Sequence, residues 1–141
     1  MCIRDSNVTE AYYYIGFKIN KNQSLYEEIE EAGFILVFRE HHKNMRGEKK
    51  GNVDTDMVFD IMKRLQKQPD SFNKIVLVSG DGDFRKLVDY LIGEARFEII
   101  LLPDWDNASS LYKAITDKYY ENISKPETIK RIGKPKRKKR R

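Results

Sequence analysis

Short apolar runs alternate along this chain with longer segments in which apolar residues recur every three or four positions. Runs of β-branched and aromatic residues are typical of strands, whereas the wider spacing indicates amphipathic helices. The pattern predicts strands at 11–15, 34–38, 75–78 and 98–102, and helices at 24–32, 53–68, 84–94 and 108–120. Because strands alternate with helices, we expect an α/β fold with a mostly parallel sheet and helices on both faces.

Residues at the ends of these segments indicate where helices begin and end. Ser24 and Glu27 have the spacing of a capping box, and Gly33 fits the position just after the same helix. Asp83 is placed to cap the helix that begins near Phe84.

The run Ile75–Val78 has no polar break, which predicts a strand buried on both faces. Ser79, Asp81 and Asp83 follow it, separated by glycines that allow a sharp turn. Ligands of open α/β sheets bind at the carboxyl ends of strands, so we expect a site at Asp81 and Asp83. The alternative is that Asp83 is only a helix cap and Asp81 only a turn residue.

A second acidic group opens the helix predicted from Val53, where Asp54, Asp56 and Asp60 lie in the first two turns. Acidic residues also stabilise a helix N-terminus through the dipole, which is the simpler interpretation. If the two groups converge at one sheet edge, they form a set of oxygen ligands that favours Mg²⁺ or Mn²⁺ over zinc. Such a cation neutralises the carboxylates and activates water for phosphodiester hydrolysis.

Charge is divided unevenly along the chain. The segment 125–141 holds ten Lys/Arg and one acidic residue, a net charge of +9, whereas the body, 1–124, has seventeen basic and twenty-one acidic residues, a net charge of −4. We expect the tail to be disordered and to bind a polyanion, most simply RNA. The basic stretch 39–52 is expected to form a loop in which Lys49 and Lys50 contact phosphates. A solvated loop and a solvated tail are the alternatives.

Composition excludes several classes of protein. The single cysteine, Cys2, excludes a disulfide framework and a cysteine-based zinc site, and it fits a cytoplasmic protein. No apolar run approaches the roughly 20 residues of a membrane span. The sequence also lacks the G-x-x-x-x-G-K phosphate loop of NTPases.

Several segments resemble the NYN domains, in the LabA-like branch of the PIN-like nuclease superfamily. The resemblance covers roughly residues 11–124. It depends most on two blocks in the expected order and separation, 50–56 (KGNVDTD) and 79–84 (SGDGDF). The aromatic strand 12–14, the segment 25–34 and, more weakly, the segment 110–119 add to it.

This resemblance implies a Rossmann-like α/β/α sandwich with strand order 3-2-1-4-5, a divalent-metal acidic site and ribonuclease-type chemistry. By position, Asp54, Asp81 and Asp83 are the catalytic and metal-binding acids, and Asp56 is a neighbouring metal ligand. Residues expected to contact nucleic acid are Ser79, Lys49, Lys50, Arg85, Lys136 and Arg137. A homodimer is compatible with the sequence.

One feature departs from the family pattern. NYN domains open with a strand that ends in an Asp, and this chain has no such strand before Tyr12. Met1–Ser6 (MCIRDS) instead resembles the conceptual translation of a transposase adapter used in library preparation. We therefore expect the first strand and helix to be missing, residues 7–124 to form a partial domain, and stability and nuclease activity to be impaired. The alternatives are a non-catalytic RNA-binding protein and another phosphate-handling α/β enzyme that uses D-x-D, such as a phosphatase or a topoisomerase-primase-like domain.

Overall fold

The computed structural model describes residues 7–39 and 53–132, and the chain divides into two compact units, 1–71 and 72–141. Met1–Ser6, Lys49, Lys50, Lys136 and Arg137, together with most of the loop predicted at 39–52, lie outside the described residues.

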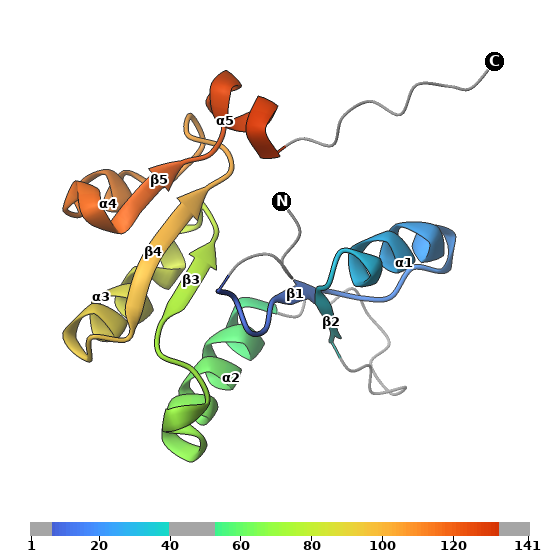
Figure 1. The fold of residues 1–141 in the computed structure, drawn as a ribbon, viewed down its shortest axis with the longest axis horizontal. Helices are drawn as coiled ribbons and strands as arrows, with labels where there is room; N and C mark the ends of the chain where they lie inside the picture. The colour runs from blue at the N-terminus through green and yellow to red at the C-terminus, as the bar shows by residue number, and fades with distance from the viewer. Residues whose placement is uncertain (1–6, 40–52, 133–141) are drawn as a thin grey trace, which may run out of the picture. The chain divides into compact units, whose positions relative to one another are not determined.

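The first unit is built on two parallel strands (Figure 1). β1 pairs with β2 so that Tyr12 lies level with Ile35, and helix α2 packs against β1. The elements of this unit are β1 (Tyr12–Ile15), α1 (Gln23–Glu31), β2 (Ile35–Phe38) and α2 (Val53–Lys67), with short 3-10 turns at Asn20–Asn22 and Pro69–Ser71.

The start of α1 differs from the prediction, because the helix begins at Gln23 and Ser24 lies inside it. The capping box is therefore wrong: Asn22 is the cap residue and makes no side-chain cap bond, and Gln23 instead donates to Glu27 at 3.1 Å. The predicted end is confirmed, since Gly33 follows the last turn with φ 100°, a conformation that favours glycine. Tyr26 anchors the helix with its buried ring.

The second unit has three parallel strands in the order β3-β4-β5 (Figure 1). The predicted α/β class with parallel pairing is confirmed in both units. The neighbour pairs β1-β2 and β3-β4 agree with the strand order that the family resemblance implied. The elements are β3 (Ile75–Val78), α3 (Arg85–Gly93), β4 (Phe97–Leu102), α4 (Ser110–Lys113), β5 (Tyr120–Asn122) and α5 (Pro126–Ile132), with 3-10 turns at Gly82–Phe84 and Asp117–Tyr119.

The core of the second unit lies on one face of its sheet. Its fully buried side chains are Val88, Leu91, Ile100, Leu102 and Tyr112. The prediction that β3 is buried on both faces is wrong, because Val76 and Val78 are 44% and 58% exposed while Leu77 is buried. Successive strand residues point to opposite faces, so only the face that carries Leu77 is covered.

The helix predicted over 108–120 is also wrong, since α4 makes one turn and is followed by a 3-10 turn and strand β5. Within α4 the side chain of Leu111 is 48% exposed, whereas Tyr112 is fully buried. The backbone of Tyr120–Asn122 pairs with β4 as a strand, so a helix cannot continue through these residues. The predicted disordered tail likewise contains helix α5, which begins with Pro126 at a position that favours proline.

Candidate functional site

The residues 79–83, which we call the acidic turn, leave the carboxyl end of β3 in a fixed conformation. The amide of Ser79 donates to the carbonyl of Leu101 at 3.2 Å, which extends the pairing with β4. The amide of Asp81 donates to Ser79 Oγ at 3.1 Å, and the amide of Asp83 donates to Asp81 Oδ1 at 2.9 Å. Local hydrogen bonds thus define the turn before α3 begins.

The cap of this turn is Asp81 and not Asp83, which corrects the prediction from the sequence. A 3-10 turn at Gly82–Phe84 precedes α3, so the capping position lies two residues earlier than expected. One oxygen of Asp81 therefore has a structural role. The carboxylate of Asp83 is exposed and has no hydrogen-bond or ion-pair partner in the part of the chain that the structure describes.

Two contacts hold the acidic turn against the rest of the second unit. The buried hydroxyl of Tyr112 donates to the carbonyl of Asp81, and burial, with a smaller effect of the Asp81 charge, raises the pKa of Tyr112 to about 12. The amide of Ser109 donates to the carbonyl of Gly80 at 2.9 Å. A Cβ at Gly82 would lie 2.5 Å from Ser109 Oγ, so the approach requires glycine there.

The acidic residues of the first unit lie at the start of α2. Asp54 and Asp56 occupy its first turn, and Asp56 Oδ2 is 4.0 Å from a guanidinium nitrogen of Arg39. Asp60, one turn further along, accepts a hydrogen bond from the hydroxyl of Tyr14 at 3.1 Å. Asp60 therefore joins α2 to β1.

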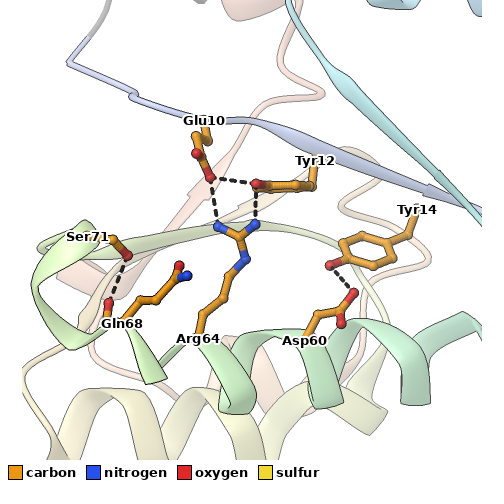
Figure 2. A network of polar contacts seen from close by, with 7 residues as sticks. All are labelled: Glu10, Tyr12, Tyr14, Asp60, Arg64, Gln68 and Ser71. Atoms are coloured by element: carbon orange, nitrogen blue, oxygen red, sulfur yellow. Dashed lines mark hydrogen bonds and ion pairs between the residues drawn. The ribbon is translucent and has the colours of Figure 1, made fainter. Parts of the chain in front are cut away.

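A second connection between α2 and β1 uses Arg64, as Figure 2 shows. Its guanidinium donates to Glu10 at 2.7 Å and to the hydroxyl of Tyr12, and it lies 4.5 Å from the centroid of the Tyr12 ring. Hydrogen bonds from Tyr12 and Arg64 lower the pKa of Glu10, and burial raises the pKa of Tyr14. Sequence reasoning missed this network, although three adjacent tyrosines on one strand were the available signal.

The comparisons with known proteins agree with this arrangement. The family model described as the NYN domain matches residues 2–124. The chain belongs to the NYN domain family. It is 26% identical over 121 residues to the "Low amplitude and bright protein LabA" of Synechococcus elongatus, an alignment that covers 81% of this chain and 62% of that protein. The chain thus spans less than two thirds of the length of this curated relative.

A crystal structure of a protein of unknown function from Vibrio parahaemolyticus has a similar fold. It is 21% identical in sequence, with a TM-score of 0.59, and the match covers 81% of this chain and 69% of that one. Among residues 7–39 and 53–132 of this NYN domain, no helix is long and apolar enough to cross a membrane.

The acidic residues that the family resemblance assigned are divided between the two units. Asp54 and Asp56 lie in the first unit, and Asp81 and Asp83 lie in the second. Within the described ranges, no three His, Cys, Asp or Glu side chains are grouped closely enough to hold a metal ion. Asp81 and Asp83 nevertheless fit Mg²⁺ in donor type and exposure, because this ion is often held by one or two carboxylates and keeps several waters.

Two of the residues predicted to contact nucleic acid lie in the acidic turn or just after it: Ser79 is its first residue, and Arg85 begins α3. Ser79 Oγ accepts the amide of Asp81, so its first role is to shape the turn. Arg85 donates through Nε to both oxygens of Asp89 at 2.8 and 2.9 Å and through Nη1 to the carbonyl of Leu111. These bonds use two of the five guanidinium N–H groups and hold Arg85 in place, and its contact with RNA stays a prediction.

Proposed function

We propose that this NYN domain hydrolyses phosphodiester bonds of RNA, with Asp54, Asp81 and Asp83 as the acids of the site. The observation that carries the proposal is the acidic turn, which presents the free carboxylate of Asp83 and the second oxygen of Asp81 at the carboxyl end of β3. This edge of an α/β sheet is where ligands bind. Membership of the NYN family supports the same site.

In this proposal the acids hold Mg²⁺ or Mn²⁺, with Asp56 as a neighbouring ligand. When bound, the ion supplies an activated water and stabilises negative charge on the phosphate. The chain's own contribution is preorganisation. Ser79 and Tyr112 fix the backbone of Asp81, so the carboxylates need little rearrangement when substrate arrives.

The test is cleavage of a labelled single-stranded RNA with Mg²⁺ or Mn²⁺, compared with the same reaction in EDTA. We expect Asp83→Asn to abolish metal-dependent cleavage while leaving RNA binding and the melting temperature close to the parent values. Asp70→Asn is the matched control, because Asp70 is also exposed but lies in the 3-10 turn after α2. Equal cleavage by the parent and by Asp83→Asn, or cleavage that persists in EDTA, contradicts the proposal.

A second candidate is an RNA-binding domain without catalysis, and the capping bond of Asp81 favours it. Because Asp81 Oδ1 accepts the amide of Asp83, folding alone accounts for an acid at this position. This candidate predicts that RNA binds in a salt-sensitive manner and stays intact in Mg²⁺ and in Mn²⁺. The same cleavage assay therefore separates the two functions.

A further inference from the structure

Two aromatic rings of the second unit stack on each other. Trp105 lies in the loop after β4 and Tyr120 lies on β5, with ring centroids 5.7 Å apart and an interplanar angle of 28°. The exposed side chain of Lys113 holds its ammonium 4.8 Å from the centroid of the Trp105 ring. Neither ring is fully buried, so this pair adds a partly solvated aromatic surface to the unit rather than filling its core.

A pocket of about 470 Å³ adjoins the two rings. Its volume lies within the range of roughly 300–1,000 Å³ that is typical of small-molecule sites. Its lining combines two aromatic rings, two carboxylates, one amide and one cation: Trp105, Asp117, Tyr120, Glu121, Asn122 and Lys125. Such a mixture suits a flat ring with polar edges.

The polar groups of this pocket have a definite orientation. Asn122 Oδ1 accepts hydrogen bonds from the amide of Ser124 at 2.9 Å and from its hydroxyl at 2.6 Å. The amide nitrogen of Asn122 has no hydrogen-bond partner among the described residues and is a donor for a ligand. Asp117 uses one oxygen to accept the hydroxyl of Tyr120 at 3.1 Å and keeps the other as an acceptor.

Trp105 follows the carboxyl end of β4, the strand that pairs with β3, and the acidic turn follows the carboxyl end of β3. The loop that carries Trp105 also contains Ser109, whose amide bonds to Gly80. β5 lies two strands from β3, which is roughly 10 Å at the usual strand spacing. A chain of nucleotides can therefore contact both places.

We propose that Trp105, Tyr120 and the adjoining pocket bind an unpaired base of an RNA strand whose backbone continues to the acidic turn. The base stacks on Trp105 in place of Lys113, whose ammonium then pairs with a phosphate. Asn122 and Asp117 face the polar edge of the base. The inference rests on the proposed function for the identity of the ligand as RNA.

Two lysines and two carboxylates lie around the rings, so the site as a whole carries no net charge. Lys113 already covers a face of Trp105, and Lys125 lies 3.5 Å from Glu121 in an exposed ion pair that opens at little cost. The ammonium groups of Lys113 and Lys125 are both exposed, so either can turn toward the phosphate of a bound nucleotide. A duplex does not fit, because its bases are stacked inside the helix and cannot reach the rings.

Trp105 is the single tryptophan of the chain, so its fluorescence reports directly on this site. The full chain is titrated with an unlabelled single-stranded RNA 12-mer and with the duplex of the same sequence, in EDTA to prevent cleavage and in about 0.2 M salt to weaken contacts of the basic tail. We expect saturable quenching by the single strand and none by the duplex. Single-strand binding without quenching, or quenching by tetramethylammonium but not by RNA, overturns the inference.

Variants test the same contact by anisotropy of a labelled 12-mer. We expect Trp105→Ala to weaken binding between about five-fold and about a hundred-fold, the range for one stacked base. Trp105→Phe keeps an aromatic ring and is expected to retain most of the affinity. This variant shows whether the loss in Trp105→Ala comes from the missing ring or from a folding defect. Tyr90→Ala removes an exposed aromatic residue of α3 and is the matched control.

Equal affinity of the parent and Trp105→Ala overturns the inference. The outcome for the proposed function is separate. If RNA quenches Trp105 but is not cleaved, the ribonuclease proposal is contradicted and the base site is supported. If RNA is cleaved equally well by the parent and by Trp105→Ala, the base site is contradicted and the ribonuclease proposal is supported.

Discussion

The buried hydroxyl of Tyr112 links the stability of the second unit to the geometry of the acidic turn. It donates to the carbonyl of Asp81 from a side chain with no solvent exposure. We expect Tyr112→Phe to lower the free energy of unfolding by about 1 kcal/mol, because the ring stays and one hydrogen bond is lost. Urea unfolding measures this value, and Tyr90→Phe, with its exposed ring, is the control that should change little. An unchanged midpoint for Tyr112→Phe contradicts the assigned contact.

The raised pKa of Tyr112 also predicts how stability depends on pH. In the folded protein the pKa of the Tyr112 hydroxyl is about 12, whereas the pKa of an unperturbed tyrosine is 10.0. Between these values the native state binds more protons than the unfolded state, so stability is complete below about pH 10 and falls as the pH rises toward 12. The pKa of Tyr14 is raised in the same direction and adds to the loss.

We therefore expect the melting temperature of Tyr112→Phe to fall less steeply above pH 10 than that of the parent. Thermal scans from pH 8 to 12 measure the two slopes. Parallel curves for parent and variant contradict the raised pKa of this residue.

At the scale of single residues, the sequence predicted the position of the acidic residues better than it predicted the role of each side chain. The D-x-D pattern after an apolar run located Asp81 and Asp83 at the carboxyl end of β3, as the structure has them. It assigned the cap to the wrong Asp, because a 3-10 turn before α3 moved the capping position by two residues. Such a turn depends on the contact of Gly82 with Ser109, which local sequence does not encode.

At the scale of elements, helix α2 is fixed on β1 by polar contacts as well as by apolar packing. Tyr14 donates to Asp60, and Arg64 bonds to Tyr12 and Glu10 (Figure 2). We expect a double-mutant cycle of Tyr14→Phe and Asp60→Ala to give a coupling free energy of about 1 kcal/mol. A cycle of Tyr13→Phe with Asp60→Ala is the control, because the ring of Tyr13 contacts Phe34 instead. Coupling near zero in the first cycle contradicts the contact.

Predictions of helices and strands succeeded where an amphipathic pattern continued over many residues. They failed where backbone pairing between strands determined the structure. The recurrence of apolar residues every three or four positions predicted a helix at 53–68, which agrees with α2 to within a residue at its end. Strand β5 was missed because its three residues become a strand only through the ladder with β4. The same contact shortened the predicted last helix to one turn of α4 and a 3-10 turn.

At the scale of the whole molecule, the sequence indicated which strands are neighbours. It did not establish that the acids of α2 and those of the acidic turn form one site. Each parallel pair follows from a short strand, a helix and a second strand close in the chain. The meeting of Asp54 with the acidic turn depends on contacts between residues far apart in sequence. It therefore stays a prediction, and the cleavage assay supports it only if Asp54→Asn loses activity as Asp83→Asn does.

The uneven distribution of charge makes the salt dependence of RNA binding a property of the whole chain. Residues 133–141 hold seven Lys/Arg and no acidic residue, whereas the body carries a net charge of −4. Each phosphate that a cation neutralises on a single strand adds about 0.7 to the slope of log K against log salt. We expect truncation after Ile132 to reduce that slope by up to about 5, that is 0.7 for each of seven cations.

Anisotropy titrations of a labelled 12-mer at about 0.05 to 0.3 M salt give the slope of log K against log salt for the parent and for the truncated chain. Over this range the screening of charges by salt changes strongly. A chain in which the seven cations are replaced by Gln is the control for length, and it should match the truncation. Quenching of Trp105 at saturating RNA should persist in both, because stacking on the ring is separate from phosphate neutralisation. An unchanged slope would instead show that cations of the body hold the RNA, so the tail would have no part in binding.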